Sequence, residues 1–269
     1  MNLRTRLFWI NEDSRAVFAL KGPWGIRKAS IAKRSDGGCR IIDPDSFNEA
    51  LDALECAAKS IDEIVYIENS SLCSFEIVNV PCGRRKSIAC ALAENHFRAA
   101  SRINEKEHII SSRIVKSDGF TSSHFVCAIE VKDIDSAFII SKRYKIKISG
   151  IYCGIDAAIC AYIKGSSEMT KSYGAIALDS GYSYSIAVMH EGNPVAAFRA
   201  KKSEYARAVE KIKETLLSCS GEAIEDLVII SGEGDFFAEH ITSGAMIRVD
   251  NLIVSREVQE YIMEGIPMG

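Results

Sequence analysis

The chain has 269 residues, of which 47% are hydrophobic and 26% are charged, and its formal net charge is −3. This composition supplies enough apolar material for one large core or two modest ones, and it indicates a soluble globular protein. Neutralising phosphates needs a clustered surplus of Lys and Arg, so the slightly acidic balance argues against nucleic acid as a partner.

Cysteine usage and hydropathy indicate the cellular compartment of the protein. The nine cysteines are an odd number and form no C-x-x-C pair, which argues against a disulfide framework or a zinc cluster. The first apolar stretch, residues 7–10, is too short for the hydrophobic region of a signal peptide. No window approaches the length of a membrane span. We therefore predict a cytoplasmic protein that meets a membrane only indirectly, through partners.

The first block of the chain predicts a small mixed α/β unit. Apolar runs predict strands at 15–20, 26–33 and 39–42. Helix-start residues at 43–46 precede apolar residues with the spacing of one helix face, which are Phe47, Leu51, Leu54, Ala58 and Ile61. A strand predicted at 63–68 completes the order three strands, a helix and a strand, and a further strand is predicted at 73–80.

The next segment predicts a helix at 84–103 that carries Ile88, Leu92, Ala99 and Ile103 on one side. The cluster Arg84-Arg85-Lys86 opens this helix, where the helix dipole disfavours cations. It is either a solvated turn or a patch for an acidic partner segment. Strands at 108–116 and 123–131, a helix at 133–143, a strand at 145–150 and a helix at 152–163 follow.

A linker at 165–167 separates two patterned regions, and the opening pattern then returns. Strands are predicted at 174–178, 183–190 and 194–200, a helix at 203–219, a strand at 226–231, a short helix at 235–243 and a strand at 246–249. The repetition predicts a duplicated α/β architecture with two lobes that face each other across a cleft. The predicted domains are a first lobe at 1–164, with an inserted subdomain at about 73–145, and a second lobe at 165–269.

The stretch at 178–188 is the most specific motif in the chain, because it places an Asp-x-Gly turn between two strands. It resembles the second phosphate loop of the actin-like superfamily. The resemblance implies that Asp179 helps to hold magnesium and its water, that Gly181 lets the backbone approach phosphate, and that Ser183 and Ser185 add hydroxyls. An ordinary hairpin turn uses the same residue types.

A second loop follows about fifty residues later, where a buried strand at 226–231 ends in Gly232-Glu233-Gly234 before a helix. It resembles the adenosine-side loop of the same superfamily, in which small residues such as Gly232 and Gly234 admit a base and ribose. A lone Gly-x-Gly also occurs in plain strand-to-helix turns. The two loops in this order, within a duplicated architecture, are stronger evidence for the resemblance than either loop alone.

The whole chain looks like the PilM and GspL group of actin-like proteins, which line the cytoplasmic side of type IV pilus and type II secretion machines. The strand pair at 64–80, the region at 133–158 and the final segment at 265–269 carry this likeness. It implies a two-lobed, duplicated, ribonuclease H-like α/β fold. It also implies two partners: the tail of an inner-membrane protein, bound in a groove of the first lobe, and the assembly ATPase.

The first phosphate loop departs from the superfamily pattern. Placing the returning strand on residues 14–17 puts Asn11 where an Asp is expected, Asp13 at the glycine position and Phe18 at the lysine position. A carboxylate at the glycine position would repel phosphate and add bulk, which weakens nucleotide binding.

We therefore expect a scaffold with a degenerate nucleotide site, no catalytic residues and no cofactor. The alternatives are an ATP-binding switch in the same machine, with magnesium on Asp179, and a small-molecule kinase of the same superfamily. No hydrolase, metalloprotease or P-loop motif is present in the sequence. The five histidines show no i, i+4 pair that would predict another metal site.

Overall fold

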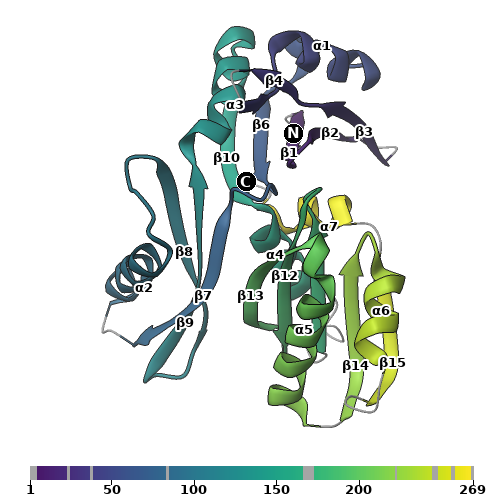
Figure 1. The fold of residues 1–269 in the computed structure, drawn as a ribbon. Helices are drawn as coiled ribbons and strands as arrows, with labels where there is room; N and C mark the ends of the chain where they lie inside the picture. Colours follow the sequence, from purple (N-terminus) through teal and green to yellow (C-terminus); the bar gives the residue numbers. More distant parts are fainter. Residues whose placement is uncertain are drawn as a thin grey trace. The chain divides into compact units, whose positions relative to one another are not determined.

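The structure, a computed structural model, describes residues 5–22, 25–36, 39–82, 85–165, 173–221, 223–243, 248–255 and 258–267 (Figure 1). Four sequence predictions therefore fall partly outside the described residues: Arg84 of the basic cluster and of the helix it opens, positions 166 and 167 of the linker, the start of the strand at 246–249, and positions 268 and 269 of the final segment. Among the described residues, no helix is both long and apolar enough to cross a membrane.

Contacts divide the chain into two compact units, one formed by Met1–Cys73 and Ile129–Gly154 and the other by Ser74–Ala128 and Ile155–Gly269. This grouping differs from the predicted boundaries at 1–164, 73–145 and 165–269. The helix and strand predicted at 133–150 lie with the first unit, and the sheet that precedes them in sequence lies with the second.

The first unit contains a five-stranded sheet with the strand order β10-β6-β1-β2-β3. Strand β1 is antiparallel to β2 and parallel to β6. The strands are β1 (Arg6–Asn11), β2 (Arg15–Gly22), β3 (Gly25–Ala32), β6 (Glu63–Glu68) and β10 (Lys147–Cys153). The other elements are β4 (Arg34–Asp36) and β5 (Cys39–Ile41), which form a separate ribbon, with α1 (Pro44–Ala53), η1 (Ala58–Ser60) and α3 (Val131–Tyr144).

An aromatic cluster forms the core of this unit. The ring centroids of Trp9, Phe18, Phe47 and Tyr66 lie 5.0 to 6.3 Å apart. Phe47 comes from α1, which begins where the sequence predicted, because the Asp43 carboxylate accepts a hydrogen bond from the Ser46 backbone N–H at 2.8 Å. The third strand of the opening meander is β3 rather than 39–42, because β1 supplies the first strand and the sequence prediction omitted it.

The second unit contains a sheet with the order β13-β12-β11-β14-β15, which repeats the order of the first sheet strand for strand. Its elements are β11 (Tyr173–Asp179), β12 (Ser183–His190), β13 (Asn193–Lys201), η3 (Lys202–Glu204), α5 (Tyr205–Ser220), β14 (Ala223–Ser231), α6 (Gly234–Thr242) and β15 (Arg248–Ser255). The predicted duplication of architecture is therefore present in the structure.

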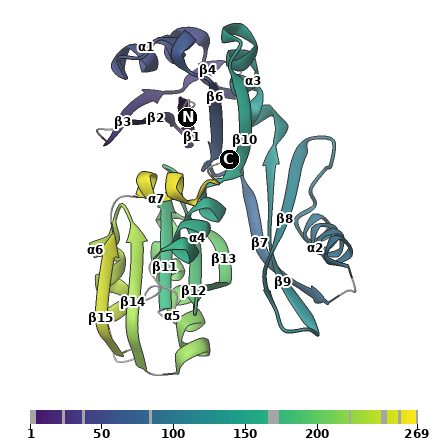
Figure 2. The ribbon, with the colours of Figure 1, turned by 180° about the vertical axis from the view of Figure 1, so that it is seen from behind.

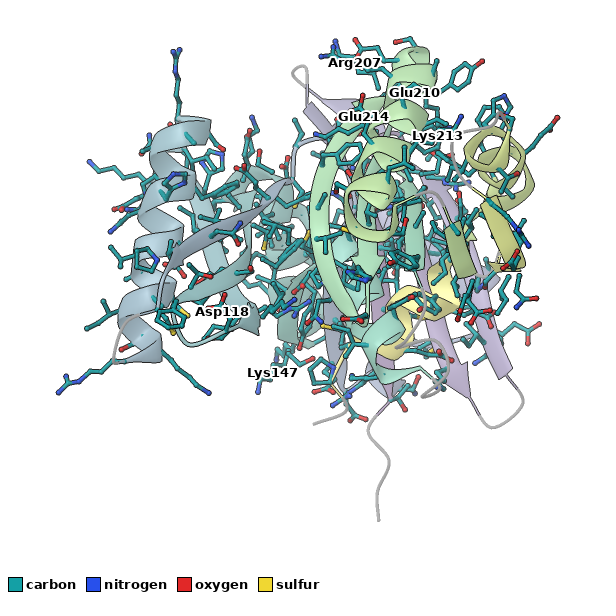
Figure 3. The ribbon with its side chains drawn as sticks, turned by 90° about the horizontal axis from the view of Figure 1, so that it is seen from below. Asp118, Lys147, Arg207, Glu210, Lys213 and Glu214 are labelled. Carbon is teal, nitrogen blue, oxygen red and sulfur yellow. The ribbon has the colours of Figure 1, made fainter. Side chains whose placement is uncertain are left out.

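Helices cover both faces of this sheet. One face packs on the apolar sides of α5 and α6 through residues such as Ala175, Ile212 and Phe237. The charged residues Arg207, Glu210 and Glu214 also lie on α5 (Figure 3). The reverse view shows α4 (Gly154–Lys164) and α7 (Val258–Gly265) on the side of the sheet away from α5 (Figure 2).

A smaller sheet, β7-β9-β8, is inserted in the sequence between β6 and α3. It consists of β7 (Ser74–Pro81), β8 (His108–Ser117) and β9 (Thr121–Glu130), and α2 (Lys86–Ser101) packs against it.

Helix α2 buries a different face from the predicted one. Ala89, Ala93 and Phe97 pack on the sheet, whereas Ile88 and Leu92 are 50% and 44% exposed. Small alanine side chains let the helix approach the sheet closely, so they take the inner face although they are less hydrophobic.

Candidate functional site

Each of the two duplicated sheets carries an equivalent hairpin at the position of a predicted phosphate loop. Asn11, the last residue of β1, pairs with Ala16, and Asp179, the last residue of β11, pairs with Tyr184. Both turns are closed by the same backbone hydrogen bond, from Glu12 to Arg15 in one and from Ser180 to Ser183 in the other, each 2.9 Å long. Asn11 therefore corresponds to Asp179, and Asp13 corresponds to Gly181, as the sequence registration predicted.

In the first hairpin, Asn11 is held by a glutamate that the sequence analysis missed. Its side-chain amide nitrogen lies 3.1 and 2.9 Å from the two carboxylate oxygens of Glu68, which ends the neighbouring strand β6. The Tyr66 hydroxyl donates to the same carboxylate at 2.8 Å, and so does the Ser70 backbone N–H, also at 2.8 Å. Glu68 has no solvent exposure. These hydrogen bonds take the place of those that solvent would supply to the carboxyl oxygens.

Asp13 also has partners within the first unit. One of its carboxylate oxygens accepts hydrogen bonds from the Ser71 backbone N–H at 2.7 Å and from the Ser71 hydroxyl at 2.6 Å. Asp13 has no positive φ, whereas Gly181 at the corresponding position has φ +107°. Together with Glu12, which is 5% exposed, Asp13 and Glu68 place three buried carboxylates at this end of β1 and β6. Such a cluster repels phosphate.

Asp133, in the first turn of α3, borders the same cluster. Burial, and after it the nearby Glu68 and Glu130 carboxylates, raise the pKa of Asp133 to about 7. Its Oδ2 atom is buried without a hydrogen-bond partner among the described residues. Burial and the Glu68 carboxylate also raise the pKa of Tyr66 well above its usual value, so this hydroxyl stays protonated as a donor.

In the second hairpin, both carboxylate oxygens of Asp179 are engaged. One accepts a hydrogen bond from the Gly181 backbone N–H at 2.7 Å, and the other lies 2.7 Å from the Lys202 ammonium nitrogen. Lys202 also lies 3.9 Å from a Glu233 carboxylate oxygen and 5.4 Å from the centre of the Tyr184 ring. The ammonium group therefore lies against Asp179, the residue that the sequence resemblance assigned to magnesium.

Glu233 is the counterpart of Glu68. Ala177 lies beside Ser231 in the parallel pair β11–β14, and extending this register by two residues brings Asp179 to Glu233, as Asn11 is brought to Glu68. The Tyr184 hydroxyl donates to the Glu233 carboxylate. Burial and this hydrogen bond raise the pKa of Tyr184 well above its ordinary value. An alignment of β6 with β14 in the sequence would have identified the two glutamates as equivalent.

The predicted serines lie on the other face of the sheet from Asp179. Tyr184 and Ile186 belong to the core under α5 and α6, so the alternating residues Ser183 and Ser185 face the opposite way. Both are buried. The Ser183 hydroxyl lies 2.8 Å from that of Ser180, and the Ser185 hydroxyl accepts a hydrogen bond from Arg199 at 3.2 Å. The structure does not bring these hydroxyls together with Asp179.

The two predicted glycines of the second loop differ in their surroundings. A side chain at Gly234 would come within 2.4 Å of Val254, so this glycine is required for α6 to begin close to β15. At Gly232, an added Cβ would meet no atom within 4 Å. Gly232 therefore leaves open space next to Glu233, whereas Gly234 has a packing role.

Comparisons with known proteins show the fold. No protein-family model and no curated protein match the chain. A Bacteroides thetaiotaomicron protein of unknown function with an actin-like ATPase fold is 11% identical, with a TM-score of 0.60 over 97% of this chain and 95% of that one. The PilM-PilN type IV pilus biogenesis complex contains a chain that is 10% identical, with a TM-score of 0.63 over 97% of this chain and 94% of that one.

The cytoplasmic domain of EpsL, an inner-membrane component of the Vibrio cholerae type II secretion system, is 10% identical over 97% of this chain and 94% of its own, with a TM-score of 0.49. The two stronger matches, together with the repeated strand order, confirm the predicted actin-like fold.

Proposed function

We propose that this actin-like chain is a scaffold of a type IV pilus or type II secretion machine, that it works at the cytoplasmic face of the inner membrane, and that its nucleotide site is degenerate. In this proposal it docks the cytoplasmic tail of an inner-membrane protein and the assembly ATPase. It is not an enzyme and needs no cofactor. The likeness to PilM, which was solved in a complex with PilN, supports the assignment to such a machine.

The observation that carries the degenerate site is the internal pairing of both phosphate-loop positions. Asn11 is hydrogen-bonded to the buried Glu68, and Asp179 is paired with Lys202 at 2.7 Å. A nucleotide with magnesium would have to displace Lys202 from Asp179. At the first hairpin, considered by itself, phosphate would meet the carboxylate of Asp13 where the family has glycine. Both features oppose binding.

The alternative function is an ATP-binding switch, and two observations favour it. Gly181 has the positive φ that a close phosphate approach uses, and Gly232 is surrounded by open space. If nucleotide binds, Asp179 is the residue that would hold magnesium, and Gly181, Gly232 and Gly234 would lie along the nucleotide. Magnesium would then supply charge neutralisation for the phosphates.

A titration with magnesium-ATP distinguishes the two functions. A ligand that binds only the native state stabilises it, so binding would appear as a rise in melting temperature. Because the site is degenerate, we expect no such rise and no calorimetric heat at millimolar ATP. A clear rise that disappears in Asp179→Ala would contradict the degenerate site and support the switch. Lys202→Ala is the second variant, because it removes the internal cation. If Lys202 blocks the site, this variant should bind magnesium-ATP although the unchanged protein does not.

Docking is tested separately, with synthetic peptides that correspond to the cytoplasmic N-terminal tails of inner-membrane pilus and secretion proteins from the same organism. We expect one of them to bind with an affinity unchanged by ATP or by Asp179→Ala. If none of these tails binds, and the assembly ATPase also fails to bind, the scaffold proposal is wrong whatever the nucleotide result.

A further inference from the structure

The end of the inserted sheet at which β8 and β9 turn carries an exposed aromatic residue. Phe120, in the turn between these strands, is 86% exposed. The Cys82 backbone N–H, just after β7, donates to the Phe120 carbonyl at 2.7 Å, so the chain leaves β7 next to this turn. Helix α2 begins four residues later, at the same end of the inserted sheet (Figure 1).

Asp118 fixes the turn that projects Phe120 (Figure 3). Its carboxylate accepts hydrogen bonds from the backbone N–H groups of Phe120 at 2.9 Å and Thr121 at 2.7 Å, and from the Thr121 hydroxyl at 3.0 Å. These bonds, the one from Thr121 first, lower the pKa of Asp118. Asp118, the one acidic side chain described in this turn, is therefore engaged in the hydrogen bonds that fix the turn.

Exposed apolar side chains also lie on α2. Ile88, in the first turn of the helix, is 50% exposed, and Leu92, one turn further, is 44% exposed. Ala89, Ala93 and Phe97, which pack on the sheet, form the neighbouring strip of α2, about 100° round the helix. The exposed parts of Ile88 and Leu92 lie beyond this packed strip and are not needed for the fold of the inserted sheet, so they point to an external contact.

Cations surround this apolar surface. The inserted segment 74–128 contains eight Lys and Arg against five Asp and Glu, a net +3 in a chain whose net charge is −3. Arg85, Lys86 and Lys116 are exposed near the turn. Arg85 and Lys86 stand at the start of α2, where the helix dipole disfavours positive charge, so helix stability does not explain them.

We infer that this end of the inserted sheet, which we call the basic tip and which comprises Arg85, Lys86, Ile88, Lys116 and Phe120, docks directly on an anionic lipid bilayer. Phe120 and Ile88 enter the boundary between headgroups and acyl chains, and the three cations lie against acidic headgroups. An aromatic group at the apex of a rigid turn with flanking cations suits a lipid surface, since it offers a point of insertion rather than a groove.

This inference adds a direct membrane contact to the indirect one expected from the sequence. It does not depend on the identity of the protein partner. Vesicle sedimentation with the full chain tests it. We expect the protein to sediment with vesicles of phosphatidylglycerol and phosphatidylethanolamine, to bind phosphatidylcholine vesicles at least about tenfold more weakly, and to be released by high salt.

Two variants locate the contact. Phe120→Ser and the double variant Arg85→Gln/Lys86→Gln should each lose most of the binding, the double variant by roughly fivefold for each cation removed. Phe138→Ser and Lys142→Gln/Lys147→Gln are matched controls, because they remove an exposed aromatic and two exposed cations from the first unit. The controls should sediment as the unchanged protein does.

Fluorescence separates insertion from simple adsorption. In Phe120→Trp, the emission added by the new indole should shift to shorter wavelength when anionic vesicles are present. Absence of sedimentation with anionic vesicles, equal sedimentation of the tip variants and the controls, or an unshifted emission would each overturn the inference. If the tip variants lose a protein partner while the unchanged protein ignores vesicles, the tip is a protein-binding surface instead.

Discussion

At the residue scale, the departure of the first hairpin from the actin-like pattern has a physical cause in Glu68. This carboxylate is fully buried and receives two contacts from the Asn11 amide, at 3.1 and 2.9 Å. An amide can donate to a carboxylate, whereas an aspartate at the same position could not. The second hairpin can keep Asp179, because Lys202 supplies a cation and Glu233 is 44% exposed at its side chain.

Asn11→Asp tests this account. It places a second carboxylate against Glu68 in a buried site, and we expect the free energy of unfolding at pH 8 to fall by about 3 kcal/mol or more. Asp179→Asn, the reverse change in the equivalent hairpin, removes one part-exposed ion pair and should cost no more than about 1 kcal/mol. Urea unfolding of the two variants measures the difference. Similar losses in both would show that Glu68 is not the cause.

Asp133 gives a pH prediction in the same cluster. Its pKa is raised to about 7, chiefly by burial. Between about pH 4 and pH 7 the folded protein therefore keeps a proton that the unfolded chain releases, so this contribution to stability is complete at low pH and is lost as the pH rises through 7.

Asp133→Asn should remove this pH dependence and raise the free energy of unfolding at pH 8 by about 1 kcal/mol, a value discounted for partial solvent exposure and for the favourable helix dipole. Asp135→Asn, an exposed neighbour on the same helix, is the control. Urea unfolding at pH 5.5 and pH 8 measures both. If Asp133→Asn keeps the slope of the unchanged protein, the carboxylate does not titrate in this range.

At the element scale, α4 and α7 pack at a position that admits only glycine. A Cβ added at Gly265, the last residue of α7, would lie 1.7 Å from the Ala157 carbonyl oxygen of α4. This contact is with backbone, which cannot rotate away as a side chain does. The sequence did not predict α7, although its glycine is what allows the two helices to meet.

Gly265→Ala should therefore lower the free energy of unfolding by about 3 kcal/mol, the upper range for overpacking. Gly232→Ala is the matched control, since a Cβ there meets nothing within 4 Å, and it should change stability by less than about 0.5 kcal/mol. Thermal and urea unfolding measure both changes. Equal tolerance of the two substitutions would contradict the close contact between α4 and α7.

At the scale of the whole molecule, stacked aromatic and cationic groups connect the inserted sheet to the larger sheet of the second unit. Arg199 of β13 lies 5.3 Å from the ring centre of Phe75 on β7. Phe75 stacks on Phe125 at 6.1 Å, and Arg113 lies 5.9 Å from the Phe125 ring while it pairs with Asp156 of α4 at 2.7 Å. These contacts connect β13 and α4 to a sheet that the sequence assigned to the first lobe.

A double-mutant cycle with Arg199→Ala and Phe75→Ala tests this connection. We expect a coupling free energy of about 0.5–1 kcal/mol, because each single variant already removes the cation–π contact. Arg207→Ala, combined with Phe75→Ala, provides a control pair in which the arginine has no contact with Phe75. Additive effects in the Arg199 cycle would show that the contact does not bind the inserted sheet to β13.

By itself, the sequence determined the succession of elements and the duplicated architecture. Hydrophobic periodicity and turn residues are local signals, so β6, β12 and α5 were predicted close to their observed bounds, and the Asp179 hairpin was recognised from its spacing. The equivalence of Asn11 with Asp179 also follows from spacing along two strands. Strand β1 escaped prediction, because its apolar run at residues 7–10 is only four residues long.

Only the tertiary structure decided which side chains meet. Glu68 and Lys202 are 57 and 23 residues from the partners that make them important, and no local pattern identifies such pairs. The inner face of α2 is formed by Ala89, Ala93 and Phe97 rather than by Ile88 and Leu92, which the helical spacing had indicated. Burial and partner geometry are properties of the packed chain, so the sequence predicted the Asp179 hairpin and its equivalence with Asn11 but not the internal groups that contact these two residues.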